Sequence, residues 1–164
     1  MDDIQNKVRP RRWLTMFGRS GIGKSHIARG LYNWWKNSDE CKGQQVNDDY
    51  GCIFHGAFKE WPLLATELRA NKGGDDIILE LMQEPFLVID DIGAAADRTG
   101  FITGQLIVLL TQRMDKWTVI TSNKSLEAVE KEIDGRIASR MIRGSNRCLA
   151  VDVVDYALRE KGNL

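Results

Sequence analysis

Eight residues near the start of the chain, Gly18 to Ser25 (GRSGIGKS), have the types and spacing of a phosphate-binding loop. They fit the pattern G-x-x-x-x-G-K-[ST] in full. Glycines allow backbone N–H groups to turn inward around phosphate oxygens, and the start of a helix adds a partial positive charge. The Lys24 ammonium is expected to reach the β- and γ-phosphates of a nucleotide, and the Ser25 hydroxyl to ligate Mg²⁺. The chemistry predicted is binding of a nucleoside triphosphate.

Two adjacent aspartates end a second segment, FLVIDD at 86–91. A continuous apolar run that ends in acids is typical of a buried parallel strand. In a nucleotide site, Asp90 is expected to hold the Mg²⁺ shell through water, and Asp91 to polarise the water that attacks the γ-phosphate. The simpler interpretation is a pair of acids that cap a strand, with Asp91 solvated.

A third segment, WTVITSN at 117–123, ends in small hydrogen-bonding side chains. A buried strand places such residues at the C-terminal edge of the sheet, where ligands gather in open α/β folds. Asn123 is therefore expected to orient a water or to contact the γ-phosphate. The alternative is an ordinary strand-to-helix loop in which Ser125 is the N-cap.

Three arginines recur at spacings of four and three in DGRIASRMIRG, residues 134–144. This spacing places Arg136, Arg140 and Arg143 along one side of a helix. Taken alone, the segment is a solvated basic face, a nucleic-acid contact, or a device directed at another molecule's nucleotide.

Strand-like and helical segments alternate around these motifs. We expect strands at 13–17, 51–55, 86–90, 117–121 and 148–151. Helical patterns begin at Lys24, run from about Pro62 to Ala70, restart at Asp75, cover 103–114, and take up most of 126–144. The alternation predicts an α/β fold with a parallel sheet covered by helices on both faces.

The composition suits one globular domain. The chain has 164 residues, 43% of them hydrophobic, and 23 basic residues balance 23 acidic ones. The zero net charge gives no general indication of nucleic-acid binding, although local patches remain open. The cysteines at 41, 52 and 148 lack CxxC spacing, which argues against a disulfide framework or a zinc site. With no run of ~20 apolar residues and no secretory signal, we expect a cytoplasmic, soluble protein with no membrane partner.

In this order and at these separations, GRSGIGKS, FLVIDDIG, TVITSN and GRIASRM resemble the AAA+ ATPase core of the DnaC/IstB type. That group includes bacterial and phage helicase loaders and transposition helper ATPases, and is close to the initiator DnaA. The resemblance implies a P-loop NTPase with a five-stranded parallel sheet of order 5-1-4-3-2 and an absent or minimal lid. It divides the chain into a basic arm (1–12), the AAA+ core (13–155) and a tail (156–164), with a two-helix insertion at 56–84.

The resemblance also implies roles for single residues, with ATP and Mg²⁺ as cofactors. Asp90 and Ser25 serve the metal, and Asp91 replaces the more usual catalytic glutamate. Asn123 becomes the γ-phosphate sensor. Arg140 becomes the arginine that projects into the neighbouring subunit's ATP, with Arg136 as a second candidate. The expected nucleotide contacts are Gly18, Arg19, Ser20, Gly21, Ile22, Gly23, Lys24, Ser25 and His26.

The function that follows is ATP hydrolysis in DNA replication by a helicase-loader-like homo-oligomer, with ATP at the subunit interface, assembled on single-stranded DNA. The protein partner is a replicative helicase or, if the chain acts as a transposition helper of the IstB type, a transposase. Only about a dozen residues precede the first strand, where loaders usually carry a helicase-binding region, so helicase binding stays open. From different classes, the alternatives are a small P-loop kinase and a non-hydrolysing nucleotide switch.

The inserted segment 56–84 is the expected site of DNA contact. Phe58 and Trp61, placed at the head of the inserted helices, could stack on a base, although aromatics at such spacing are more often core residues. Lys59, Arg69 and Lys72 could follow a phosphate backbone, but the acids between them favour a solvated mixed face.

Overall fold

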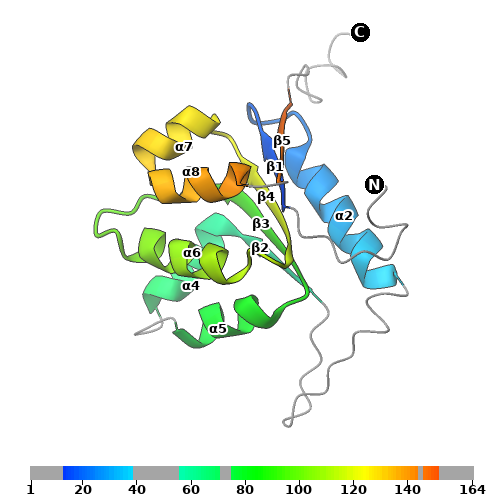
Figure 1. Ribbon diagram of the computed structural model, residues 1–164, viewed down its shortest axis with the longest axis horizontal. Coiled ribbons are helices and arrows are strands. Elements are labelled where there is room, and N and C mark those ends of the chain that lie inside the picture. The colour runs from blue at the N-terminus through cyan, green and yellow to red at the C-terminus, as the bar shows by residue number, and fades with distance from the viewer. Residues whose placement is uncertain (1–12, 39–55, 71–74, 144–145, 152–164) are drawn as a thin grey trace, which may run out of the picture.

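The computed structural model describes residues 13–38, 56–70, 75–143 and 146–151. Five strands alternate with helices along the chain (Figure 1). The strands are β1 (Trp13–Phe17), β2 (Ala57–Glu60), β3 (Phe86–Ile92), β4 (Trp117–Ser122) and β5 (Arg147–Ala150). The helices are α2 (Lys24–Asn37), α4 (Trp61–Ala70), α5 (Asp75–Gln83), α6 (Phe101–Gln112), α7 (Leu126–Glu132) and α8 (Gly135–Ile142).

All strand pairs in the sheet are parallel, and the strand order is β2-β3-β4-β1-β5. The predicted order 5-1-4-3-2 is therefore confirmed, counted from the other edge. β3 and β4 lie inside the sheet and carry the apolar runs FLVI and VI, because an inner strand of a parallel sheet is buried on both faces.

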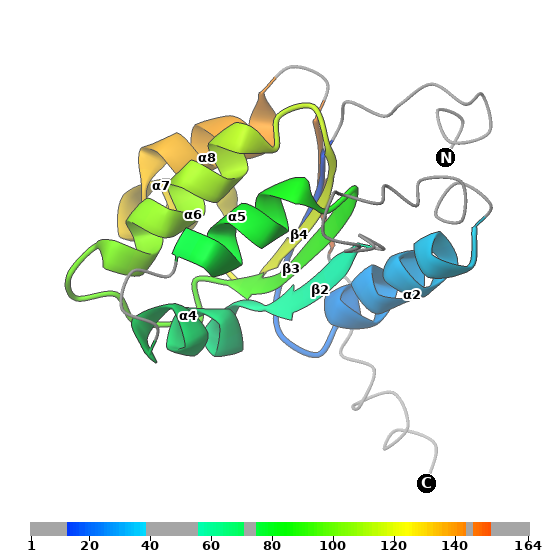
Figure 2. The same ribbon diagram turned by 90° about the horizontal axis from the view of Figure 1, so that it is seen from below.

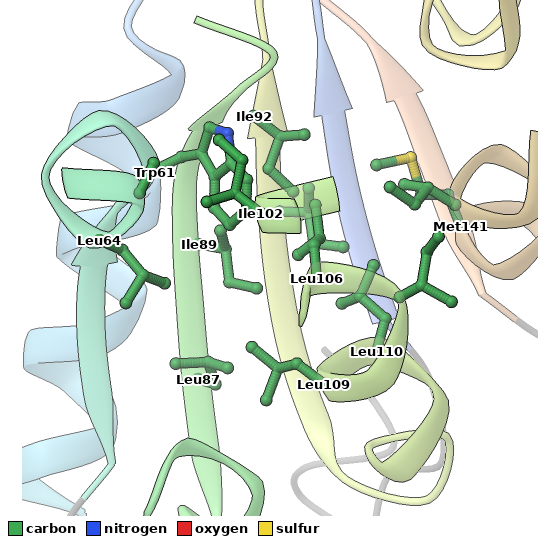
Figure 3. Close-up of a cluster of buried hydrophobic side chains, with 14 of the residues drawn as sticks. Trp61, Leu64, Leu87, Ile89, Ile92, Ile102, Leu106, Leu109, Leu110 and Met141 are labelled. Carbon is green, nitrogen blue, oxygen red and sulfur yellow. The ribbon is translucent and has the colours of Figure 1, made fainter. Parts of the chain in front are cut away.

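Helices cover both faces of the sheet unequally. In the described part of the chain, α2 lies on one face and α4, α5, α6, α7 and α8 lie on the other, as the two views in Figures 1 and 2 show. Alternate residues of β3 serve the two sides: Leu87 and Ile89 join the larger apolar cluster, while Val88 joins the smaller one beneath α2. Figure 3 shows the larger cluster, in which α6 supplies a row of side chains that includes Leu106 and Leu110.

The second strand differs from its predicted place. The predicted segment 51–55 lies outside the described residues, and the strand that pairs with β3 is Ala57–Glu60. Phe58 therefore lies on an edge strand and not at a helix head. Its ring packs 5.9 Å from the ring of Tyr32, and the guanidinium of Arg29 lies 4.3 Å from its centroid. Trp61 is buried in the core, so the packing interpretation holds for this side chain.

The other elements follow their predicted positions closely. The helical segment expected over 126–144 is divided near Asp134, because the Asp134 carboxylate accepts from the Arg136 N–H and caps a new helix there. α6 begins at Phe101, two residues earlier than expected. No helix among the described residues has the length and apolarity to cross a bilayer. Lys72, the predicted arm and the predicted C-terminal tail lie outside the described residues.

Candidate nucleotide-binding site

The three predicted motifs lie at or just after the carboxyl ends of three adjacent strands. The phosphate-binding loop (Gly18–Ser25) follows β1, the aspartates end β3, and Asn123 follows β4. Because β3, β4 and β1 are neighbours and run in parallel, their carboxyl ends meet at one edge of the sheet. Sheet topology therefore brings the motifs together.

Glycines give the loop a backbone that other residues rarely adopt. Gly18 has φ 147°, and a Cβ atom there would lie 2.4 Å from the carbonyl oxygen of Val151. Gly23 has φ 92°, and a Cβ built on it meets nothing within 4 Å. Gly18 is thus required by close packing under the loop, and the open side at Gly23 is where a bound group can approach the backbone.

The loop leads into a helix end that suits an anion. Gly23 is the N-cap of α2, no side chain caps this end, and the first turn contains no acid. The first backbone N–H groups of α2 and the positive end of the helix dipole are therefore available to phosphate oxygens. Ser25 and His26 are exposed in this first turn, whereas the Ile22 side chain is buried and anchors the loop.

Lys24 is held at the centre of the edge. Its Nζ donates to the carbonyl oxygens of Gly18 and Arg19, each at 2.7 Å. It also donates to Asn123 Oδ1 at 2.7 Å. Burial lowers the pKa of the Lys24 ammonium, and the carboxylates on β3 oppose this by favouring the charged form. The cation is thus placed between the phosphate-binding loop and the acids of β3.

A β-bulge presents the two aspartates. The pairing of β3 with β4 is regular up to Ile89 and resumes at Ile92, so Asp90 and Asp91 both lie opposite the single residue Thr121. Asp91 also has φ 62°, the only positive φ of a non-glycine residue in the described chain. Consecutive residues of a regular strand point to opposite faces. The bulge and the left-handed residue remove this constraint, so both carboxylates can lie at the carboxyl-terminal edge of the sheet.

Hydrogen bonds connect these acids to β4. The Thr121 hydroxyl donates to Asp90 Oδ1 at 2.6 Å and accepts from the Asp91 N–H at 2.8 Å. Asn123 Nδ2 donates to Asp91 Oδ1 at 2.6 Å, so Asn123 bridges Asp91 and Lys24. Burial, followed by the negative charge of Asp90, raises the pKa of the Asp91 carboxyl, and Lys24 opposes the rise. Of these three hydrogen bonds between β4-end residues and the acids, two involve Asp91.

The segment after β4 contains both features expected of it, a polar residue at the site (Asn123) and a helix N-cap (Ser125). Ser125 is the N-cap of α7, where its side chain accepts from the Ala128 N–H at 3.2 Å. Asn123 lies outside that cap and belongs to the site through its two hydrogen bonds. A strand-to-helix loop and a polar site residue therefore occupy the same short segment.

The donor set fits Mg²⁺ held jointly with phosphate oxygens. Asp90 is buried, and within the described residues its Oδ2 has no hydrogen-bond partner, so one carboxylate oxygen is left for a metal shell. The described residues contain no cluster of three or more His, Cys, Asp or Glu groups that could hold a metal ion. Mg²⁺ commonly binds through one or two protein oxygens together with phosphates and water, which matches Ser25 and Asp90.

The two arginines of α8 have different surroundings. Arg136 pairs with the N-cap Asp134 through Nε and Nη2, both at 2.9 Å. Arg140 donates from Nη1 to the Arg136 carbonyl oxygen at 2.9 Å, and forms no ion pair within the described residues. No hydrogen bond in the described chain joins Arg140 to the phosphate-binding loop or to the aspartates of its own subunit. Arg136 is thus committed to its cap, and Arg140 is the freer of the two.

Sequence reasoning did not assign a role to Thr121. It grouped Thr121 with its neighbours as small polar residues at the sheet edge, and missed that this hydroxyl contacts both acids. A threonine near the end of an inner strand, in a site where the neighbouring strand carries two consecutive acids, is the signal that points to it.

Solved structures share this fold. A structure of the DnaC helicase loader matches with TM-score 0.65 and 20% identity, over 92% of this chain and 85% of that one. A DNA replication initiation factor matches with TM-score 0.67 and 13% identity, over 92% and 44%. The initiator DnaA bound to AMPPCP and single-stranded DNA matches with TM-score 0.67 and 14% identity, over 98% and 47%.

The chain thus spans less than half of the two initiator structures and most of the loader. No family model and no curated protein matches the sequence. The resemblance to AAA+ ATPases of the DnaC type is confirmed as a likeness of fold.

Proposed function

We propose that this chain binds and hydrolyses ATP as an AAA+ protein and acts in DNA replication in the manner of a helicase loader. The observation that carries the proposal is the hydrogen-bonded series Lys24–Asn123–Asp91 beside the uncapped start of α2. In the proposed complex, this cation, amide and carboxylate surround the γ-phosphate above the phosphate-binding loop.

The residues divide the work of hydrolysis. The α2 start and the loop backbone hold the phosphates, and Lys24 Nζ exchanges its carbonyl acceptors for phosphate oxygens. Asp91 accepts a hydrogen bond from the attacking water, and its raised pKa makes it a better proton acceptor than an ordinary aspartate. Asn123 contacts both Lys24 and Asp91, so a change at the γ-phosphate reaches the base through it. Bound Mg²⁺ supplies neutralisation of phosphate charge.

The replication role is supported by the likeness of fold to a helicase loader and to a DnaA that carries AMPPCP and single-stranded DNA. We place this chain on single-stranded DNA as a homo-oligomer, with a replicative helicase as protein partner. The segment 56–84, assigned to the loader-type insertion, contains the sheet strand β2 followed by the two helices α4 and α5. Lys59 pairs with Glu67, so the mixed charges there neutralise one another in part.

ATP turnover with no phosphate acceptor tests the proposal. We expect release of inorganic phosphate from ATP and Mg²⁺ alone, stimulated by a poly-dT oligonucleotide and not by the same concentration of duplex DNA. Turnover that requires an added acceptor would identify a kinase. ATP binding without any turnover would identify a nucleotide switch.

Replacement of Arg140 tests the assembly. In the wild type, ATPase activity is expected to rise faster than linearly with protein concentration, because the neighbouring subunit completes each site. Arg140→Ala is expected to lower turnover at least about tenfold while ATP binding persists. The matched control is Arg143→Ala on the same helix, because Arg143 is exposed at the C-cap and is expected to be dispensable. Linear activity that is insensitive to Arg140 contradicts the oligomer.

A further inference from the structure

We infer that Thr121 is a positioning residue that fixes the geometry of both acidic side chains at the nucleotide edge. The inference rests on the proposed function and extends it to a residue with no part in that mechanism so far. Thr121 is 1% exposed, so its hydroxyl depends on the protein for its hydrogen bonds.

A hydroxyl is the group that this position requires. It donates to Asp90 Oδ1 and accepts from the Asp91 N–H, and a hydroxyl can do both at once. The donated bond restricts rotation of the Asp90 carboxylate and leaves Oδ2 available to a metal shell. The accepted bond fastens the peptide N–H of Asp91, where φ is 62° and an aspartate is strained.

The position of Thr121 opposite the bulge explains why one residue can serve two. The bulge sets two β3 residues against one β4 residue and interrupts the regular ladder there. At this point the Asp91 N–H donates to the Thr121 side chain. If the hydroxyl is lost, the Asp90 carboxylate loses its hydrogen-bond donor and the Asp91 N–H loses its acceptor. Both aspartate side chains can then adopt more conformations.

Substitutions at Thr121 separate this role from simple packing. Thr121→Val keeps the shape and removes the hydroxyl, whereas Thr121→Ser keeps the hydroxyl. The matched control is Thr15→Val. Thr15 lies on the neighbouring strand β1 and is equally buried, and within the described residues its hydroxyl forms no hydrogen bond with either aspartate. All four proteins are compared by melting temperature, by binding of a fluorescent ATP analogue with EDTA, by Mn²⁺ titration of the nucleotide complex, and by ATPase rate.

Thr121→Val is expected to bind the analogue in EDTA within about twofold of wild type, because the loop and Lys24 are intact. Its affinity for Mn²⁺ and its kcat are expected to fall about 10- to 100-fold, the usual effect of losing a partner of a metal-shell residue. Thr121→Ser is expected to restore both values to within a few-fold, and Thr15→Val to match wild type.

Wild-type Mn²⁺ affinity in Thr121→Val, or equal losses in Thr121→Val and Thr121→Ser, overturns the inference. If Thr121→Val does not fold, Thr121→Ala, which removes the hydroxyl without adding a methyl contact, is compared with Thr121→Ser in the same way. A wild-type protein that binds no ATP analogue would instead refute the proposed function.

Discussion

Asp91→Asn is expected to lower the kcat of ATP hydrolysis about 100-fold or more, the range for loss of a general base. The asparagine keeps the size of the side chain and can still accept a hydrogen bond from Asn123 Nδ2 through its amide oxygen. It cannot take a proton from water. Since the Asp91 carboxylate is joined to Lys24 through Asn123 and, within the described residues, forms no hydrogen bond with the loop, ATP binding is expected to stay within a few-fold of wild type.

Single-turnover rates and binding of the fluorescent analogue measure the two effects separately. The matched control is Asp115→Asn, because Asp115 is exposed in the turn before β4, at the opposite edge of the sheet from the site. Control turnover should equal that of wild type. Undiminished turnover in Asp91→Asn would show that another group activates the water, and the assignment of Asp91 would be wrong.

Arg113→Met is expected to reduce the free energy of unfolding by about 3–5 kcal/mol, the range for removing one partner from a buried charged network. Arg113 is 0% exposed. Its guanidinium donates to the carbonyl oxygens of Leu81, Glu84 and Trp117 at 2.6, 2.8 and 2.7 Å, and to the Thr118 hydroxyl at 3.2 Å. Burial lowers the pKa of the guanidinium, and the Glu84 carboxylate opposes this.

Methionine matches the length of the stem but leaves those carbonyl oxygens buried without their donors. Arg113→Lys is expected to recover little of this stability, because a single ammonium cannot reach all the acceptors that surround the planar guanidinium. Urea unfolding measures both variants, with Arg98→Met as the control at an exposed loop arginine. A loss below about 1 kcal/mol in Arg113→Met would mean that the network contributes little beyond its own desolvation.

The sequence predicted the parts of the fold that depend on local pattern. WLTMF, FLVID and WTVIT are predicted as strands because each is a short, largely apolar run between helical or loop-like segments. The strand order came from the resemblance, since no pattern within one strand shows which neighbour it pairs with. The convergence of Lys24, Asp90, Asp91 and Asn123 followed from that order.

Features that depend on contacts between distant segments were beyond the sequence. The bulge at Asp90 and Asp91 exists only relative to the register of β4, and the role of Thr121 depends on it. Nothing near Arg113 in the sequence indicates its burial, because its acceptors on Leu81 and Glu84 lie 32 and 29 residues away. The predicted place of the second strand was less secure for another reason: AFKE has little apolar character, as suits an edge strand.

The position of β1 between β4 and β5 also bears on how the domain folds. The first described strand pairs with β4 and β5, and the Trp13 N–H donates to Asn146, 133 residues away. Closing such long loops is slow, because the chain loses conformational entropy before the stabilising contacts form. The phosphate-binding loop follows β1, so its final geometry waits for the last segments of the sheet. Under the proposed function, a nucleotide therefore recognises only the completed domain, and its binding energy stabilises the whole sheet against unfolding.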